Sequence, residues 1–266
     1  MKNLINWKMF FILLAACVIT ALMVIPYSLA LTGSVVELTP FILLLSTAQN
    51  IVLFALASFL GLLLSRKVGL GLPILEGALE GKSKTAVPLT RPKAEVSRVL
   101  KSILPLSVGL GLLAGVLIVI LSIPFNSASP ELVNSETSIP AWKALLASFY
   151  GGIAEEVLLR LFLVSLFVWI SFKIKKNKEG SPTNAGIWVS IVFAAVLFGL
   201  GHLPATAQIT PLTAMVVVRA IVLNGVGGII FGWLYWKKGL ESAMIAHFSA
   251  DIVLHIITPF VAGFFS

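Results

Sequence analysis

The sequence has few charged residues and almost no cysteine, and each shortage excludes a class of protein. Charged residues make up 11% of the 266 positions, whereas soluble proteins carry about 25%. The single cysteine, Cys17, excludes an internal disulfide and any site built from several cysteine ligands. The pattern His-Glu-x-x-His of soluble zinc proteases is missing as well. An ordinary soluble domain and a disulfide-stapled domain are therefore excluded.

Hydrophobic residues are abundant, at 58% of the chain, and the mean hydropathy is +1.04. A transmembrane helix needs about 20 apolar residues. The first apolar stretch could instead be a signal peptide, because Ser28-Leu29-Ala30 resembles a cleavage site, but it is too long for one and we expect a retained helix. We predict an all-α, polytopic transmembrane bundle of seven spans, with eight as the alternative. The predicted spans are 9–31, 41–64, 102–124, 142–171, 185–203, 211–235 and 240–258.

The basic residues lie on alternate loops between these spans. Cytoplasmic loops of membrane proteins are enriched in lysine and arginine, so the alternation predicts a cytoplasmic N-terminus. The net charge of +8 is then explained by loops that face the cytoplasm, and we expect no nucleic-acid partner. Sixteen of the 19 basic residues follow this pattern: Lys2, Lys8, Arg66, Lys67, Lys82, Lys84, Arg91, Lys93, Arg98, Lys101, Lys173, Lys175, Lys176, Lys178, Lys237 and Lys238.

The two halves of the chain differ in chemistry. The interiors of the first three spans contain no ionisable residue, and Gly111 and Gly115 form a small-residue pair suited to close helix packing. Ionisable residues gather in the last four spans. We therefore divide the chain into N-terminal helices with a basic loop, 1–139, and a catalytic membrane core, 140–266.

Two adjacent glutamates lie in the fourth span, where a charge at the membrane centre costs at least about 2.5–3.5 kcal/mol. Glu156 and Arg160 are four residues apart, share a helix face and are predicted to pair. Glu155 is rotated by about 100° and has no local partner. Glu155 is thus the carboxylate predicted to be free for proton transfer, with Glu156 and Arg160 supporting it.

Three further candidates lie on later spans. His202 follows Phe198 by four residues in the fifth span, with Gly199 and Gly201 expected to leave room around the ring. His247 and Asp251, the sole aspartate, are four residues apart in the seventh. A carboxylate base with imidazoles is suited to activating water, but the same groups suit a proton relay. The residues alone leave hydrolysis and proton-coupled transport open, with a non-catalytic membrane scaffold as a third reading. Arg219 and His255 are expected to be structural.

Three motifs in order resemble a known family: Glu155-Glu156-xxx-Arg160, Phe198-xxx-His202 and His247-xxx-Asp251. This combination resembles the signature of the CPBP intramembrane proteases, also called the Abi family, which includes the type II CAAX prenyl endopeptidases. The resemblance covers roughly residues 140–258. It implies an endopeptidase that hydrolyses a peptide bond within the bilayer.

The resemblance also assigns roles. It implies that Glu155 activates water with the help of His202, while His247 and residue 251 polarise the scissile carbonyl. Family members hold asparagine or aspartate at that last position. Asp251 therefore fits a protonated donor, a residue that orients His247, or a metal ligand. A zinc ion held by His202, His247 and Asp251 is one alternative, and a metal-free glutamate mechanism is the other.

Substrate and location follow from the same resemblance. Related bacterial proteins are associated with bacteriocin immunity and peptide maturation, which implies a protein of the bacterial cell membrane. We expect the lipid bilayer and a hydrophobic or lipidated peptide as partners, and nothing in the sequence requires a prenyl group.

Overall fold

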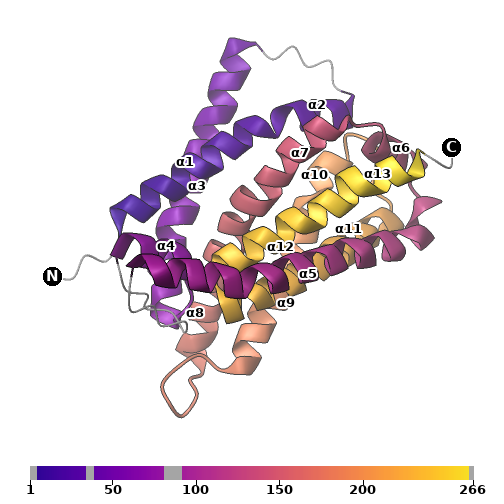
Figure 1. Ribbon diagram of the computed structural model, residues 1–266. Helices are drawn as coiled ribbons and strands as arrows, with labels where there is room; N and C mark the ends of the chain where they lie inside the picture. The colour runs from indigo at the N-terminus through magenta and orange to yellow at the C-terminus, as the bar shows by residue number, and fades with distance from the viewer. Residues whose placement is uncertain (1–4, 34–38, 81–91, 264–266) are drawn as a thin grey trace.

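The computed structural model describes residues 5–33, 39–80 and 92–263, and these ranges fold into a helical bundle (Figure 1). The first half contains α1 (Trp7–Met23), α2 (Ile25–Thr32), α3 (Pro40–Val68), α4 (Pro73–Glu80), α5 (Pro92–Asn126) and α6 (Pro130–Thr137). The second contains α7 (Ala141–Tyr150), η1 (Gly151–Glu155), η2 (Val157–Val164), α8 (Ser165–Ile174), α9 (Asn184–Gly201), α10 (Leu203–Thr206), α11 (Ala214–Lys238), α12 (Leu240–Ile252), η3 (Val253–Ile257) and α13 (Thr258–Ala262).

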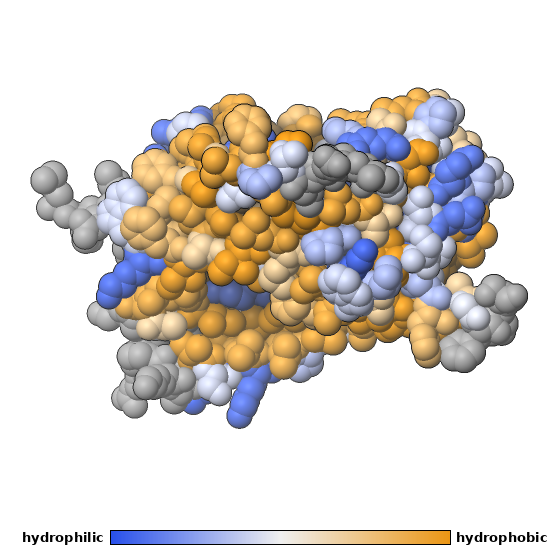
Figure 2. Space-filling view, turned by 90° about the horizontal axis from the view of Figure 1, so that it is seen from above, coloured by the Kyte–Doolittle hydropathy of each residue, from blue (hydrophilic) through white to orange (hydrophobic). Residues whose placement is uncertain are grey.

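Seven helices in the described part of the chain are long and apolar enough to cross a membrane, which confirms the predicted number. They run over Trp7–Thr32, Pro40–Val68, Val96–Asn126, Ala141–Ile174, Asn184–Thr206, Ala214–Lys238 and Leu240–Ala262. The surface is correspondingly apolar, and one face of it is mostly orange in Figure 2. Large side chains such as Phe41, Leu44 and Val189 are more than two-thirds exposed, as expected for contact with lipid. The chain is an integral membrane protein.

The first span bends where its sequence requires it. Asn6 caps the start of α1, since its side chain accepts a hydrogen bond from the backbone of Lys8 at 3.0 Å. Pro26 removes a backbone donor in the first turn of α2, so the chain divides into two helices at this point. Met9 and Cys17 of α1 are fully buried against the bundle. The bend carries α2 onward to the end of the bundle where α6 lies (Figure 1).

Glycines set the closest helix contacts. Gly111 and Gly115 of α5 face backbone oxygens of α12, where an added Cβ would clash, so their predicted role in packing is confirmed. A Cβ on Gly228 of α11 would lie 2.5 Å from the Cβ of Ala195 on α9. Gly199 also packs against the backbone of α11, which corrects the expectation that it leaves room for His202. These contacts hold α5, α9, α11 and α12 together.

The fourth span is not a uniform α-helix. Two π-helical segments, η1 and η2, interrupt it between α7 and α8, and Glu156 lies at their junction. Such π-helical turns are rare and occur frequently at functional sites. The change of winding starts at Gly151 and includes Glu155 and Arg160. The irregular part of this span is therefore the part that carries the predicted base.

Candidate active site

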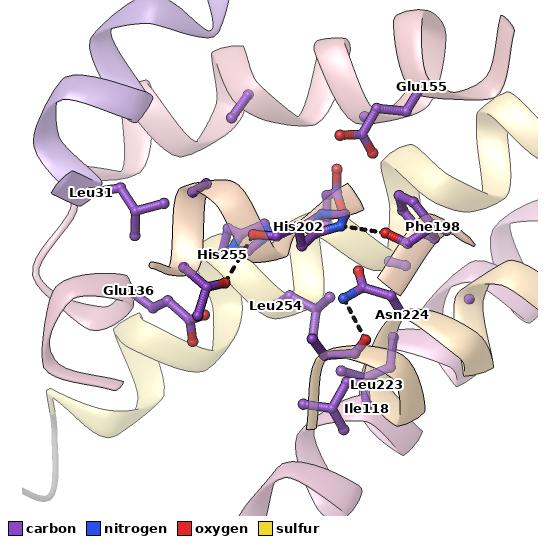
Figure 3. A pocket seen from close by; sticks show the side chains of 18 of the residues that line it. Leu31, Ile118, Glu136, Glu155, Phe198, His202, Leu223, Asn224, Leu254 and His255 are labelled. Atoms are coloured by element: carbon purple, nitrogen blue, oxygen red, sulfur yellow. Dashed lines mark hydrogen bonds between the residues drawn. The ribbon is translucent and has the colours of Figure 1, made fainter. Parts of the chain in front are cut away.

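One cavity of about 730 Å³ lies inside the bundle and receives side chains from α2, α5, α6 and the last four spans. Glu155, His202, His247 and Asp251 all line it. Figure 3 shows Glu155 and His202 entering the cavity from different helices. The structure thus brings the four predicted catalytic residues to one space, although they come from three separate spans.

A buried ion-pair network supports one wall of the cavity. Glu156 has no exposed surface, and its Oε1 lies 2.7 Å from Nη1 of Arg160. The same oxygen accepts a hydrogen bond of 2.7 Å from Nδ1 of His247. The predicted pairing of Glu156 with Arg160 is confirmed. The network also fixes the ring of His247, because its Nδ1 must carry the proton that it donates to Glu156.

The other nitrogen of His247 faces two carboxylates. Its Nε2 lies 3.7 Å from Oε2 of Glu155 and 3.6 Å from Oδ1 of Asp251. Glu155 therefore has a partner across the helix interface, whereas the sequence indicated no local one. These separations are too long for direct hydrogen bonds, but a water molecule can bridge Nε2 to either carboxylate.

His202 is the C-cap of α9 and lines the cavity. Its Nδ1 lies 2.9 Å from the backbone oxygen of Phe198, which can only accept a hydrogen bond (Figure 3). Nδ1 must therefore carry a proton, and Nε2 of the neutral ring is left as an acceptor. The motif Phe198-xxx-His202 thus positions an imidazole that is able to take a proton.

Arg160 is held by aromatic rings as well as by Glu156. Its guanidinium carbon lies 5.1 Å from the ring centre of Phe198 and 5.3 Å from that of Phe231. Phe231 also stacks on His247 with ring centres 4.8 Å apart. Sequence reasoning singled out Phe198 but not Phe231. The available signal was its place beside Gly228 and Gly232, both of which pack against α9.

A second set of polar side chains lines another part of the cavity. Nη2 of Arg219 contacts Oε2 of Glu136 at 3.1 Å, and Tyr27 contacts Nδ1 of His255 at 3.4 Å (Figure 3 labels Glu136 and His255). Partial burial raises the pKa of Glu136, and the nearby charge of Arg219 opposes this rise. The pairing of Arg219 agrees with a structural role. Sequence reasoning missed Glu136, since α6 lies in a connection between spans and no periodic pattern marks it.

The donor atoms do not form a metal site as they stand. Among the described residues, no group of three or more His, Cys, Asp or Glu side chains is arranged to hold a metal ion. Nδ1 of His247 and Nδ1 of His202 are both engaged in hydrogen bonds to oxygen. These hydrogen bonds leave Nε2 of each ring available, which is also the usual arrangement of a histidine that ligates a metal. The zinc alternative with His202, His247 and Asp251 therefore stays a prediction, and the steps proposed below use only the side chains of the protein.

Gly151 makes the approach of these groups possible. A Cβ at this position would clash with Oδ2 of Asp251 and lie 3.1 Å from Nε2 of His247. We therefore expect Gly151→Ala to displace both side chains and abolish activity, while Gly109→Ala, which meets no atom within 4 Å, leaves activity unchanged. Folded yield and cleavage rate of the two variants check this. Wild-type activity in Gly151→Ala would show that the observed packing of Asp251 is not required.

Comparison with known proteins agrees with this geometry. Residues 137–253 match the family described as type II CAAX prenyl endopeptidase Rce1-like. The matched stretch is thus similar to Rce1-like proteins. It contains Gly151 and all four predicted catalytic residues, and its family is one of proteases, so the resemblance seen in the motifs is confirmed. No curated protein and no solved structure matches the chain. Glu136 lies just before the matched range, and the division of the chain at 139/140 stays a prediction.

Proposed function

We propose that this protein is an intramembrane endopeptidase, resident in a bacterial cell membrane, that hydrolyses a peptide bond in an apolar or membrane-associated peptide. The observation that carries the proposal is the meeting of Glu155 and Asp251 around Nε2 of His247, at 3.7 and 3.6 Å, in a cavity that His202 also lines. The match to the Rce1-like family supports it, because the groups that meet there all lie within the matched residues.

Water activation is the first step. A water molecule in the cavity donates one hydrogen bond to Glu155 and another to Nε2 of His202, and Glu155 removes its proton as the oxygen attacks the scissile carbonyl carbon. The carbonyl π bond becomes a lone pair on oxygen, giving a tetrahedral intermediate. Glu155 then returns the proton to the departing amide nitrogen as the carbon–nitrogen bond breaks. The products are a carboxylic acid and an amine, so atoms and protons balance.

His247 and Asp251 stabilise the negative oxygen of the intermediate. In its doubly protonated form His247 donates from Nδ1 to Glu156, which leaves the proton on Nε2 to bind the oxyanion. Asp251, when protonated, supplies a second donor from the next turn of α12. The buried Glu156–Arg160 pair holds the histidine ring in place without touching the substrate.

An experiment in reconstituted vesicles separates the proposal from its alternatives. The purified protein is incorporated into vesicles and incubated with a library of apolar peptides, and both new peptide termini and uptake into the vesicles are measured. New termini without uptake support the endopeptidase. Uptake without new termini would replace it with the transporter reading, and neither result with retained peptide binding would replace it with a scaffold.

Asp251 provides a variant with an expected mild effect. An amide donates a hydrogen bond much as a protonated carboxyl does, so we expect Asp251→Asn to keep substantial cleavage activity. Asp251→Leu removes the donor altogether and should lose about 10²–10³-fold in kcat. Cleavage rates of the two variants on one peptide check this. An equal, severe loss in both would contradict the donor role and favour a carboxylate-specific one.

A further inference from the structure

The cavity opens toward one end of the bundle. Its exposed lining residues include Ser28 of α2, Thr137 of α6 and Ala205 of α10. Those three elements lie together with α13 near the C-terminus, away from α4 and α8 (Figure 1). The Arg219–Glu136 pair lies on the same side, between the start of α11 and α6. The mouth of the cavity is therefore the end of the bundle formed by α2, α6 and α10.

The opposite end carries the basic residues and an aromatic belt. Lys67 at the end of α3 and Lys173 at the end of α8 lie 5.7 and 5.6 Å from the ring centre of Trp169. Lys237 at the end of α11 lies 3.4 Å from the ring centre of Trp236. Tryptophan is enriched where a membrane meets water, and lysine is enriched on the cytoplasmic side of that boundary. This end therefore has the character of the cytoplasmic interface.

The mouth end is poor in basic residues. In the sequence, the connections at 24–40, 126–143 and 201–214 and the tail at 259–266 contain a single lysine, Lys143, and no arginine. Glu131 and Glu136 lie at this end instead. Because the charge bias is opposite at the two ends, the positive-inside rule places the mouth on the non-cytoplasmic side.

Packing closes the route from the catalytic residues toward the basic end. Leu161 and Leu234 have no exposed surface, and Tyr235 is 1% exposed. The hydroxyl of Tyr235 also forms a hydrogen bond of 2.8 Å with that of the buried Ser165 on α8. These side chains lie on the turns that follow Glu155 and Phe231 toward the basic end. A peptide therefore has its entry at the mouth.

We propose that the cavity opens to the non-cytoplasmic side of the membrane and receives a peptide segment presented there. The identity of the occupant as a substrate rests on the proposed function, but the direction of opening does not. The cavity wall is largely apolar, with leucines from six different elements, so the matching segment is an apolar end or loop of a translocated polypeptide. A prenylated protein of the cytoplasm would not reach this mouth.

Cysteine labelling tests the direction of opening. Cys17→Ala first removes the native, buried cysteine. Two variants then each carry one new cysteine at an exposed position: Ser138→Cys at the mouth, and Glu179→Cys in the connection at the basic end. Intact cells are treated with a membrane-impermeant maleimide. We expect complete labelling of Ser138→Cys in intact cells and labelling of Glu179→Cys only after permeabilisation. The reverse pattern would overturn the proposal.

A third variant connects the opening to the cavity itself. Thr206→Cys places a thiol on the wall of the cavity, and we expect the same external reagent to label it without permeabilisation. Where cleavage is measurable, this labelling should block it. External labelling in a protein that cleaves no peptide would uphold the opening and overturn the proposed function alone. Labelling of Thr206→Cys only from the cytoplasmic side would overturn the opening alone.

Discussion

Glu155→Gln is expected to lower the rate of peptide cleavage by about 10²–10⁴-fold, which is the usual cost of removing a general base. Glutamine keeps the shape of the side chain, and Glu155 lies at the cavity wall 3.7 Å from His247. The variant should therefore fold and retain peptide binding. The measurement is the cleavage rate under saturating peptide, together with the binding affinity for the same peptide.

Glu131→Gln is the matched control, because it makes the same chemical change at an exposed position of α6 outside the cavity. We expect this control to have wild-type cleavage. A lowered affinity with unchanged turnover in Glu155→Gln would make Glu155 a binding residue and would remove it from the chemistry.

Arg160→Ala should destabilise the fold, by about 3–5 kcal/mol, because it leaves the buried charge of Glu156 without its arginine, with only the hydrogen bond from His247 remaining. Arg160 is 2% exposed and Glu156 is not exposed at all, so water cannot replace the lost guanidinium. The rings of Phe198 and Phe231 lose the cation between them in the same step. Folded yield and thermal midpoint in detergent measure the effect.

Arg219→Ala supplies the comparison within the same bundle. Arg219 also pairs with a glutamate, but Glu136 is 35% exposed and can be hydrated when the arginine is removed. Arg219→Ala should therefore lose clearly less stability than Arg160→Ala, because exposed ion pairs contribute little. Equal stability of the two variants would contradict a structural role for the buried pair.

Local periodicity was sufficient for much of the site. Hydropathy predicted the seven spans, and the four-residue spacing of Glu156 and Arg160 predicted their contact, since both quantities depend on the helix alone. The small-residue spacing of Gly111 and Gly115 likewise predicted a close approach, although not that α12 is the partner. Asp251 was a candidate because a carboxylate inside an apolar membrane span is costly and is usually kept for a function.

Contacts between distant segments could not be predicted in this way. His247 donates to the same oxygen of Glu156 that Arg160 contacts, and His247 and Glu156 are 91 residues apart in the sequence. Glu136 comes from a connection between spans, and Gly151 acquires its importance only from the proximity of Asp251. The π-helical winding around Glu155 has no period-based signal either. Each of these features depends on how the spans pack, which single-helix patterns do not encode.

Hydrolysis in heavy-oxygen water tests the central claim most directly. The reconstituted protein cleaves its peptide in H₂¹⁸O, and mass spectrometry determines the isotope at the new carboxyl terminus. Water activated by Glu155 predicts one ¹⁸O atom in the new carboxylate for the wild type, and labelled product that forms about 10²–10⁴-fold more slowly for Glu155→Gln. Labelled product formed by Glu155→Gln at the wild-type rate would contradict the account.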